Sequence, residues 1–372
     1  MSTMLKRTLV AAGVIALFCL MPAVVNAQRA GSVPGAGAGQ GAATLTTFQT
    51  DDFSGSGVCA SCHSGLTDIA GNDVSNDAHW RSTMMANAAK DPLWQAKISS
   101  EVDRASHLQD VIEDKCSRCH MGMARYQATV DGTPVGVLAP GFLDPTHYLH
   151  DAAMDGVSCT LCHQVRPDNL ADPASFTGAY FIDTTTNPPD RPIFGPYSEN
   201  LFGTPMRDAS GFDPVFGTQI ENPAHCGSCH TLYTPVLDAN GQKVPIPGTE
   251  NPVEYEEFQE QTTYLEWEHS TVEETCQDCH LPKAVGGVKI SNRPPWLAPR
   301  EPFWQHHFVG GNSYMVGLLR DYAGGLGVTA DSVHLDATIA RTLNLLESQT
   351  AELTVDPVRS GVLLTVTVDV VN

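Results

Sequence analysis

Five copies of the pattern Cys-x-x-Cys-His constrain this 372-residue chain more than any other feature. We number them motif 1 to motif 5 in chain order: Cys59, Cys62 and His63; Cys116, Cys119 and His120; Cys159, Cys162 and His163; Cys226, Cys229 and His230; Cys276, Cys279 and His280. Ten of the 11 cysteines lie in these motifs, and only Cys19 lies outside them. The intervals between motifs are too uneven for a repeat of fixed period, so we expect one irregular domain.

This spacing is the attachment signature of c-type haem. Two thiols three positions apart can bond the two vinyl groups of one porphyrin, and the following imidazole can ligate its iron. A single motif could instead bind zinc or act as a redox dithiol, but five copies favour haem. We therefore predict five covalent haem c groups, attached through the ten motif cysteines. The motif histidines are the predicted proximal ligands: His63, His120, His163, His230 and His280.

The first 27 residues have the pattern of a secretory signal peptide. Lys6 and Arg7 precede an apolar run from Leu9 to Leu20, and a small-residue cleavage site ends at Ala27. This run is shorter than the roughly 20 residues that span a bilayer. We expect export to the periplasm or the cell exterior, with no transmembrane anchor in the mature chain.

The chain is strongly acidic, with a formal net charge of −21. Residues 1–27 contain two of the basic residues and none of the acidic ones. A surface of this sign argues against nucleic acid and anionic lipid as partners. It suits a basic redox partner such as a quinol-oxidising complex or another cytochrome, a metal cation, or solubility alone. The sequence does not predict the oligomeric state.

The sequence divides into four segments. Residues 1–27 form the signal peptide, and the Gly/Ala/Thr-rich residues 28–52 are predicted to be a flexible tether. Residues 53–325 are predicted to form a mainly α domain with extensive loop, wrapped around five haems. Residues 326–372 are expected to contain a helix and two strands, as the beginning of a β-rich domain that continues past Asn372.

Two helices have predictable starts. Pro92 suits the first turn of a helix that begins at Asp91-Pro92. Asp331 is placed to cap a helix over 331–348. Its predicted buried face consists of Val333, Ala337, Ile339, Leu343 and Leu346.

Each haem iron has a second axial position, and nine histidines lie outside the motifs. We take as distal candidates His79, His150, His225, His269 and His307. His306 and His307 are adjacent, so at most one can face a given iron, and we expect His307. Less favoured are His107, His147 and His334. Methionine would raise the potential of its haem, but methionine more often fills a core. The available methionines are Met121, Met123, Met154 and Met206.

Several phrases of the sequence resemble exported multihaem cytochromes of the cytochrome c-554/c-552 family. They lie at residues 79–84, 155–164, 229–235, 264–267 and 276–280, so the resemblance covers about residues 56–312. It implies the fold of that family and electron transfer through closely spaced, mainly bis-His haems. Respiratory or extracellular electron transfer would be the setting.

Two other functions stay open at this point. One is a catalytic cytochrome with an open haem that acts on a small nitrogen or sulfur compound. The chain lacks the Cys-x-x-Cys-Lys motif of the pentahaem nitrite reductases. The other is a subunit of a cytochrome filament, which would need a histidine donated across the subunit boundary. We expect a non-catalytic electron-transfer protein.

Overall fold

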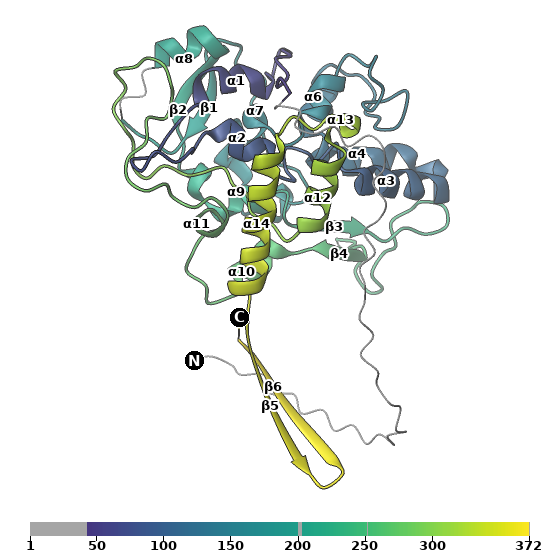
Figure 1. Cartoon of the computed structure of the whole chain (residues 1–372). Coiled ribbons are helices and arrows are strands. Elements are labelled where there is room, and N and C mark those ends of the chain that lie inside the picture. Colours follow the sequence, from purple (N-terminus) through teal and green to yellow (C-terminus); the bar gives the residue numbers. More distant parts are fainter. Residues whose placement is uncertain (1–42, 200–202, 251, 372) are drawn as a thin grey trace.

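The computed structural model describes residues 43–199, 203–250 and 252–371. The predicted signal peptide and most of the predicted tether lie outside the described residues. Helices and loops form the body, and the strands pair in three separate two-stranded sheets (Figure 1). No helix in the described ranges has the length and apolar character needed to cross a membrane.

The helices are short and irregularly spaced. In chain order they are α1 (Ser56–His63), α2 (Asn76–Arg81), α3 (Pro92–Arg104), α4 (Gln109–His120), α5 (Gly122–Val130), α6 (His150–Met154), α7 (Cys159–Cys162), α8 (Gly203–Ser210), α9 (Pro223–Gly227), α10 (Thr263–Glu268), α11 (Cys276–His280), α12 (Ser313–Asp321), α13 (Ala323–Leu326) and α14 (Ser332–Ser348). The strands are β1 (Arg191–Gly195), β2 (Phe212–Phe216), β3 (Leu232–Pro235), β4 (Glu257–Gln261), β5 (Glu352–Ser360) and β6 (Leu363–Val371).

The ordered body begins near Leu45, earlier than the predicted start at Phe53. Leu45 is buried, and the Gly57 amide donates to the Thr46 carbonyl at 2.9 Å. A Cβ atom on Gly55 would lie 2.4 Å from the Thr46 oxygen, so this close approach requires glycine. The end of the predicted tether therefore packs along α1.

The largest apolar core joins α3, α5, α6 and α7. Its buried members include Ile98, Met123, Phe142 and Leu161. Cys116 and Cys229 pack against the same cluster. Core packing therefore gathers parts of motifs 2, 3 and 4, although they lie far apart in the sequence.

Both predicted helix starts occur where the sequence placed them. Asp91 is the N-cap of α3 and accepts hydrogen bonds from the amides of Leu93 and Trp94. Asp331 is the N-cap of α14 and accepts from the His334 amide at 2.8 Å. These caps are local signals, because the side chain bonds to an amide only two or three residues ahead.

The predicted buried face of α14 is only partly right, because Ala337 and Ile339 are half-buried and Ile339 packs on the apolar cluster of α12. Val333, Leu343 and Leu346 are exposed, whereas Leu335, Thr338 and Thr342 are buried. The reason is a polar contact with the segment after α2, in which the Ser82 and Thr338 hydroxyls lie 2.7 Å apart. Because α14 packs on α12 and contacts the segment after α2, it lies against the body that carries the motifs.

The C-terminal strands form an antiparallel hairpin. All nine residues of β5 pair with β6, from Glu352 opposite Val371 to Ser360 opposite Leu363. The hairpin follows α14 and extends away from the helical body (Figure 1).

Candidate cofactor-attachment sites

The described cysteines all have free thiols, and each motif ends at or just beyond a short helix. Motifs 1, 2 and 5 complete α1, α4 and α11 with their histidines, while His163 caps the end of α7. His230 follows the last residues of α9. One helical turn therefore separates the two thiols of a motif and brings them to one side of the chain.

Four of the five motif histidines are oriented by a backbone carbonyl. The Nδ1 atoms of His63 and His163 lie 2.6 Å from the carbonyl oxygens of Ile290 and Phe194. Nδ1 of His120 lies 3.0 Å from the Ala88 oxygen, and Nδ1 of His280 contacts the Val309 oxygen. A carbonyl only accepts, so Nδ1 must carry the proton and Nε2 keeps its lone pair. This is the orientation that metal-ligating histidines adopt.

Burial favours the neutral imidazole at these positions. It lowers the pKa of His63, His120 and His163, and the carbonyl contact opposes this effect in each case. Burial also lowers the pKa of His230, which interacts with the Gln261 side chain instead of a carbonyl. A neutral ring with a free nitrogen is the form that binds iron.

Thiols of different motifs lie close enough to shift each other's pKa in three pairs. The pairs are Cys59 with Cys159, Cys119 with Cys229, and Cys226 with Cys276. In the first pair, the interaction with Cys59, and then burial, raises the pKa of Cys159, while the same interaction lowers the pKa of Cys59. Motif 1 therefore lies beside motif 3, and motif 4 lies beside both motif 2 and motif 5.

Motif 3 also neighbours motif 4. Burial, and then the nearby thiol of Cys229, raises the pKa of Cys162 to about 12. The five motifs are thus connected in space in the order 1, 3, 4, with motifs 2 and 5 both adjacent to motif 4.

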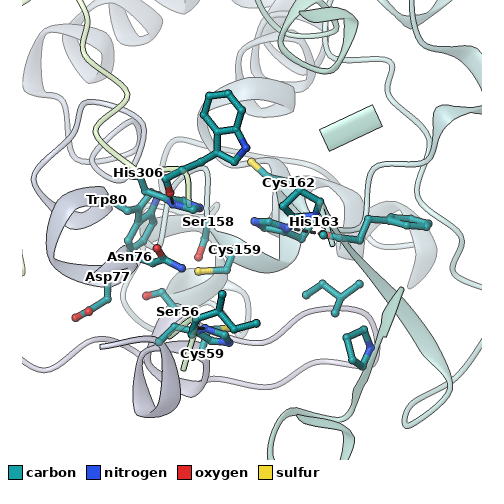
Figure 2. A pocket seen from close by; sticks show the side chains of 18 of the residues that line it. Ser56, Cys59, Asn76, Asp77, Trp80, Ser158, Cys159, Cys162, His163 and His306 are labelled. Carbon is teal, nitrogen blue, oxygen red and sulfur yellow. Dashed lines mark hydrogen bonds between the residues drawn. The ribbon is translucent and has the colours of Figure 1, made fainter. Parts of the chain in front are cut away.

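Motifs 1 and 3 open into one shared cavity (Figure 2). Side chains from both motifs line it, together with Trp80 of α2 and His306. The carbonyl contact of His163 to Phe194 comes from β1, which forms part of the same wall. Residues separated by more than 200 positions therefore meet here.

His306, the neighbour of the predicted ligand His307, lies beside His163 of motif 3. The ring centroids of His163 and His306 are 6.2 Å apart and their planes differ by 22°. Two imidazoles on opposite sides of one metal, each with a metal–nitrogen bond of about 2 Å, place their centroids roughly 6 Å apart. Nδ1 of His306 is 3.2 Å from the Trp304 oxygen, so its Nε2 is available as well.

His307 instead contacts His79. Their ring centroids are 4.3 Å apart with planes at 62°, which is too close for a metal between them. Both side chains are buried, at 6% exposure for His79 and 9% for His307. Their Nδ1 atoms have no partner among the described residues. Burial first and Arg341 second lower the pKa of His79 to about 4 and that of His307 to about 3.

The other distal candidates occupy different surroundings. His225 is interior, its Nδ1 has no partner within the described ranges, and His163 is a neighbour. Nδ1 of His150 lies 2.8 Å from the Phe142 oxygen, which leaves Nε2 free. His269 is exposed at the end of α10 with Nδ1 on the Leu265 oxygen. The structure pairs none of these three with a motif histidine in ring contact.

The less favoured ligands mostly have structural roles. His334 lies between Asp331 and Asp73, and Nδ1 of His147 accepts from the Leu149 amide. Met121 and Met123 are core residues, whereas Met206 lines the shared cavity. His107 flanks the Gly241 turn.

The donor set suits a porphyrin better than a bare ion. Within the described part of the chain, no three His, Cys, Asp or Glu side chains are grouped closely enough to hold a metal ion. A haem iron takes at most two protein ligands, because the porphyrin supplies the other four. Paired free thiols beside an imidazole with a free Nε2 fit that requirement. No sequence pattern identifies the carbonyl acceptors, since any residue type could supply them.

No family model, curated protein or solved structure matches this chain.

Proposed function

We propose that the chain is an exported c-type cytochrome that holds five covalent haems and transfers electrons. The observation that supports this most directly is the orientation of the motif histidines. Four of them bind a carbonyl through Nδ1 and present Nε2 beside two free thiols. Five Cys-x-x-Cys-His motifs, four of them with this histidine orientation, have a common explanation in haem attachment.

Bound haem would supply an iron that alternates between ferric and ferrous states. The motif cysteines would hold it through thioether bonds, and the motif histidines would ligate it. His306 would provide the second ligand at motif 3, on the far side from His163. Two neutral imidazoles stabilise both oxidation states with little movement of the protein, which suits electron transfer.

The thiol positions suggest how the sites are connected. Neighbouring thiols of two motifs would place their attachment points side by side, as for Cys59 and Cys159, which line one cavity. The protein would then have a branched path, in which motif 4 joins motif 3 to motifs 2 and 5. Of the cysteines that the structure describes, only Cys279 of motif 5 is exposed. Motif 5 is therefore our proposed exchange point with a partner.

The surface near motif 5 suggests a basic partner. Residues 244–282 contain no Lys or Arg. The exposed glutamates that precede motif 5 directly are Glu266, Glu268, Glu273 and Glu274. Burial, and then the charge of Glu274, raises the pKa of Cys279 in motif 5. Such a negatively charged surface attracts positively charged proteins and accelerates their association.

Electron paramagnetic resonance of the haem-loaded protein tests this function against catalysis. We expect five low-spin irons that do not change when nitrite or hydroxylamine is added. A high-spin iron that shifts on addition would mean an open site, and a catalytic cytochrome would then replace the electron carrier. The spectra should be recorded on protein with its haem content already measured.

A further inference from the structure

One buried carboxylate joins the beginnings of two motif helices. Oδ2 of Asp155 accepts a hydrogen bond from the Ser56 amide at 2.9 Å and from the Ser158 hydroxyl at 2.6 Å. Oδ1 accepts from the Ser56 hydroxyl at 2.7 Å. Ser56 is the first residue of α1, and Ser158 is the N-cap of α7. Asp155 is 4% exposed, so these bonds are shielded from water.

The backbone around Asp155 is fixed as well. Asp155 ends α6, and Gly156 follows with φ of 66°. A Cβ atom on Gly156 would lie 2.7 Å from the carbonyl oxygens of Met85 and Ala86, so only glycine permits the turn. The Val157 amide then donates to the Met85 oxygen at 3.0 Å. Because this backbone is fixed, the Asp155 carboxylate would stay in place if α1 or α7 shifted, and its hydrogen bonds to that helix would be lost.

We propose that Asp155 is a positioning residue that sets the separation of the cofactor sites at motifs 1 and 3. The proposal rests on the function proposed above. Cys59 lies one turn after Ser56, and Cys159 directly follows Ser158. By holding both helix starts, Asp155 keeps the Cys59 and Cys159 thiols beside each other at the wall of the shared cavity.

The donors around Asp155 specify a carboxylate. Its three bonds come from one amide and two hydroxyls, and all three groups donate to it. An asparagine amide has the same shape, but its NH2 group would face a donor in place of an acceptor. Lys90 is the buried cation nearby, and it interacts with Asp155 without a hydrogen bond among the described contacts. Asp155→Asn therefore changes the bonding pattern while preserving the volume.

The test compares variants of the full haem-loaded chain. The variants are Asp155→Asn, Ser56→Ala and Ser158→Ala. The matched control is Asp144→Asn, because Oδ1 of Asp144 accepts from the Thr146 amide and hydroxyl, both at 2.8 Å, away from the motifs. The readout is the exciton splitting of the Soret band in circular dichroism. A Cys59→Ala/Cys62→Ala variant, which lacks attachment at motif 1, identifies the part of the signal due to motifs 1 and 3.

We expect Asp155→Asn to retain five haems by intact mass and to lose the splitting assigned to motifs 1 and 3. Ser56→Ala and Ser158→Ala should each lose part of this splitting. Combining either serine change with Asp155→Asn should cause no further loss. Asp144→Asn should keep the full signal. Unchanged splitting in a fully loaded Asp155→Asn protein would overturn the proposal. If Asp155→Asn does not fold, unchanged splitting in both serine variants would overturn it equally.

A different result would overturn the proposed function itself. A wild-type protein whose mass lacks the five haems would overturn the cytochrome assignment, whatever the variants show.

Discussion

The imidazoles of His163 and His306 face each other with centroids 6.2 Å apart, although 142 positions separate them in the chain. Each ring has its Nδ1 on a backbone carbonyl, of Phe194 and Trp304 respectively. Under the proposed function, the Nε2 atoms of both rings would ligate the same iron. This pair makes the ligand assignment at motif 3 testable.

Replacing His306 with alanine should convert one low-spin iron to high spin, because His163 would lose the opposing ligand. His307→Ala should leave that iron low-spin, since His307 contacts His79 instead. The control is His334→Ala, which removes an imidazole that lies between Asp331 and Asp73. Electron paramagnetic resonance of the oxidised proteins provides the measurement. An unchanged spectrum for His306→Ala would exclude His306 as the ligand.

The buried ion pair between Arg191 and Asp52 should contribute strongly to folding. Nη2 of Arg191 is 2.6 Å from Oδ1 of Asp52, and the side chains are 1% and 2% exposed. Arg191→Met would leave Asp52 buried without its cation and should cost about 3–5 kcal/mol of unfolding free energy. Arg320→Met, which breaks more exposed pairs with Asp321 and Asp336, should cost about 0–1 kcal/mol. Urea unfolding of the haem-loaded variants compares the two free energies of unfolding. Equal losses for Arg191→Met and Arg320→Met would contradict a special contribution of the buried ion pair.

Asp183 should make stability fall in acid. Hydrogen bonds from Thr185, then Thr186 and the charge of Arg166, lower the pKa of Asp183 to about 2. The unfolded chain, with an ordinary aspartate near 4, binds a proton first as the pH falls. The stabilisation is therefore complete above about pH 4 and is lost as the pH falls toward 2.

Asp183→Asn should remove this part of the acid dependence. The measurement is the difference in unfolding free energy between pH 5 and pH 3, in the variant and the wild type. Asp208→Asn, at an exposed carboxylate on α8, should keep the wild-type dependence. If Asp183→Asn also keeps it, the hydrogen bonds to Asp183 do not stabilise the fold in this range.

The acidic surface near motif 5 should accelerate electron exchange with a basic acceptor protein. The triple change Glu268→Gln, Glu273→Gln and Glu274→Gln, at exposed residues just before motif 5, should slow the second-order rate at low salt by up to roughly 10-fold. Raising the ionic strength should shrink this difference, since salt screens exposed charges. Stopped-flow absorbance measures the rate.

A control at a distant acidic surface separates local steering from total charge. Glu347→Gln, Glu352→Gln and Asp356→Asn remove the same number of exposed charges at the end of α14 and on β5. This triple variant should retain a rate close to that of the wild type. Equal slowing by both triple variants would show that net charge alone controls the encounter.

The sequence predicts best what depends on neighbours in the chain. The motif spacing predicts the attachment residues, and Asp91 and Asp331 predict helix starts through bonds two or three positions ahead. His63 shows what the sequence does not predict, because its Nδ1 partner is the carbonyl of Ile290, 227 positions away. A backbone oxygen leaves no signature in the residue type.

The choice between His306 and His307 depends on the backbone path. Phe308 adopts a φ of 40°, a left-handed conformation that its residue type does not favour. The chain turns there, so the two adjacent imidazoles enter different environments. The buried face of α14 was mispredicted in part for a similar reason, since Thr338 turns inward to meet a hydroxyl on a distant segment, at Ser82.

The central claim is that five haems are bonded to this chain, and the mass of the exported, denatured protein tests it most directly. We expect the polypeptide that follows residue 27 plus five haems, with all ten motif cysteines resistant to alkylation. A polypeptide without added haem, or with motif thiols that react with the alkylating agent, would contradict the claim. Cys226→Ala/Cys229→Ala should lower the count by one and provides the internal calibration.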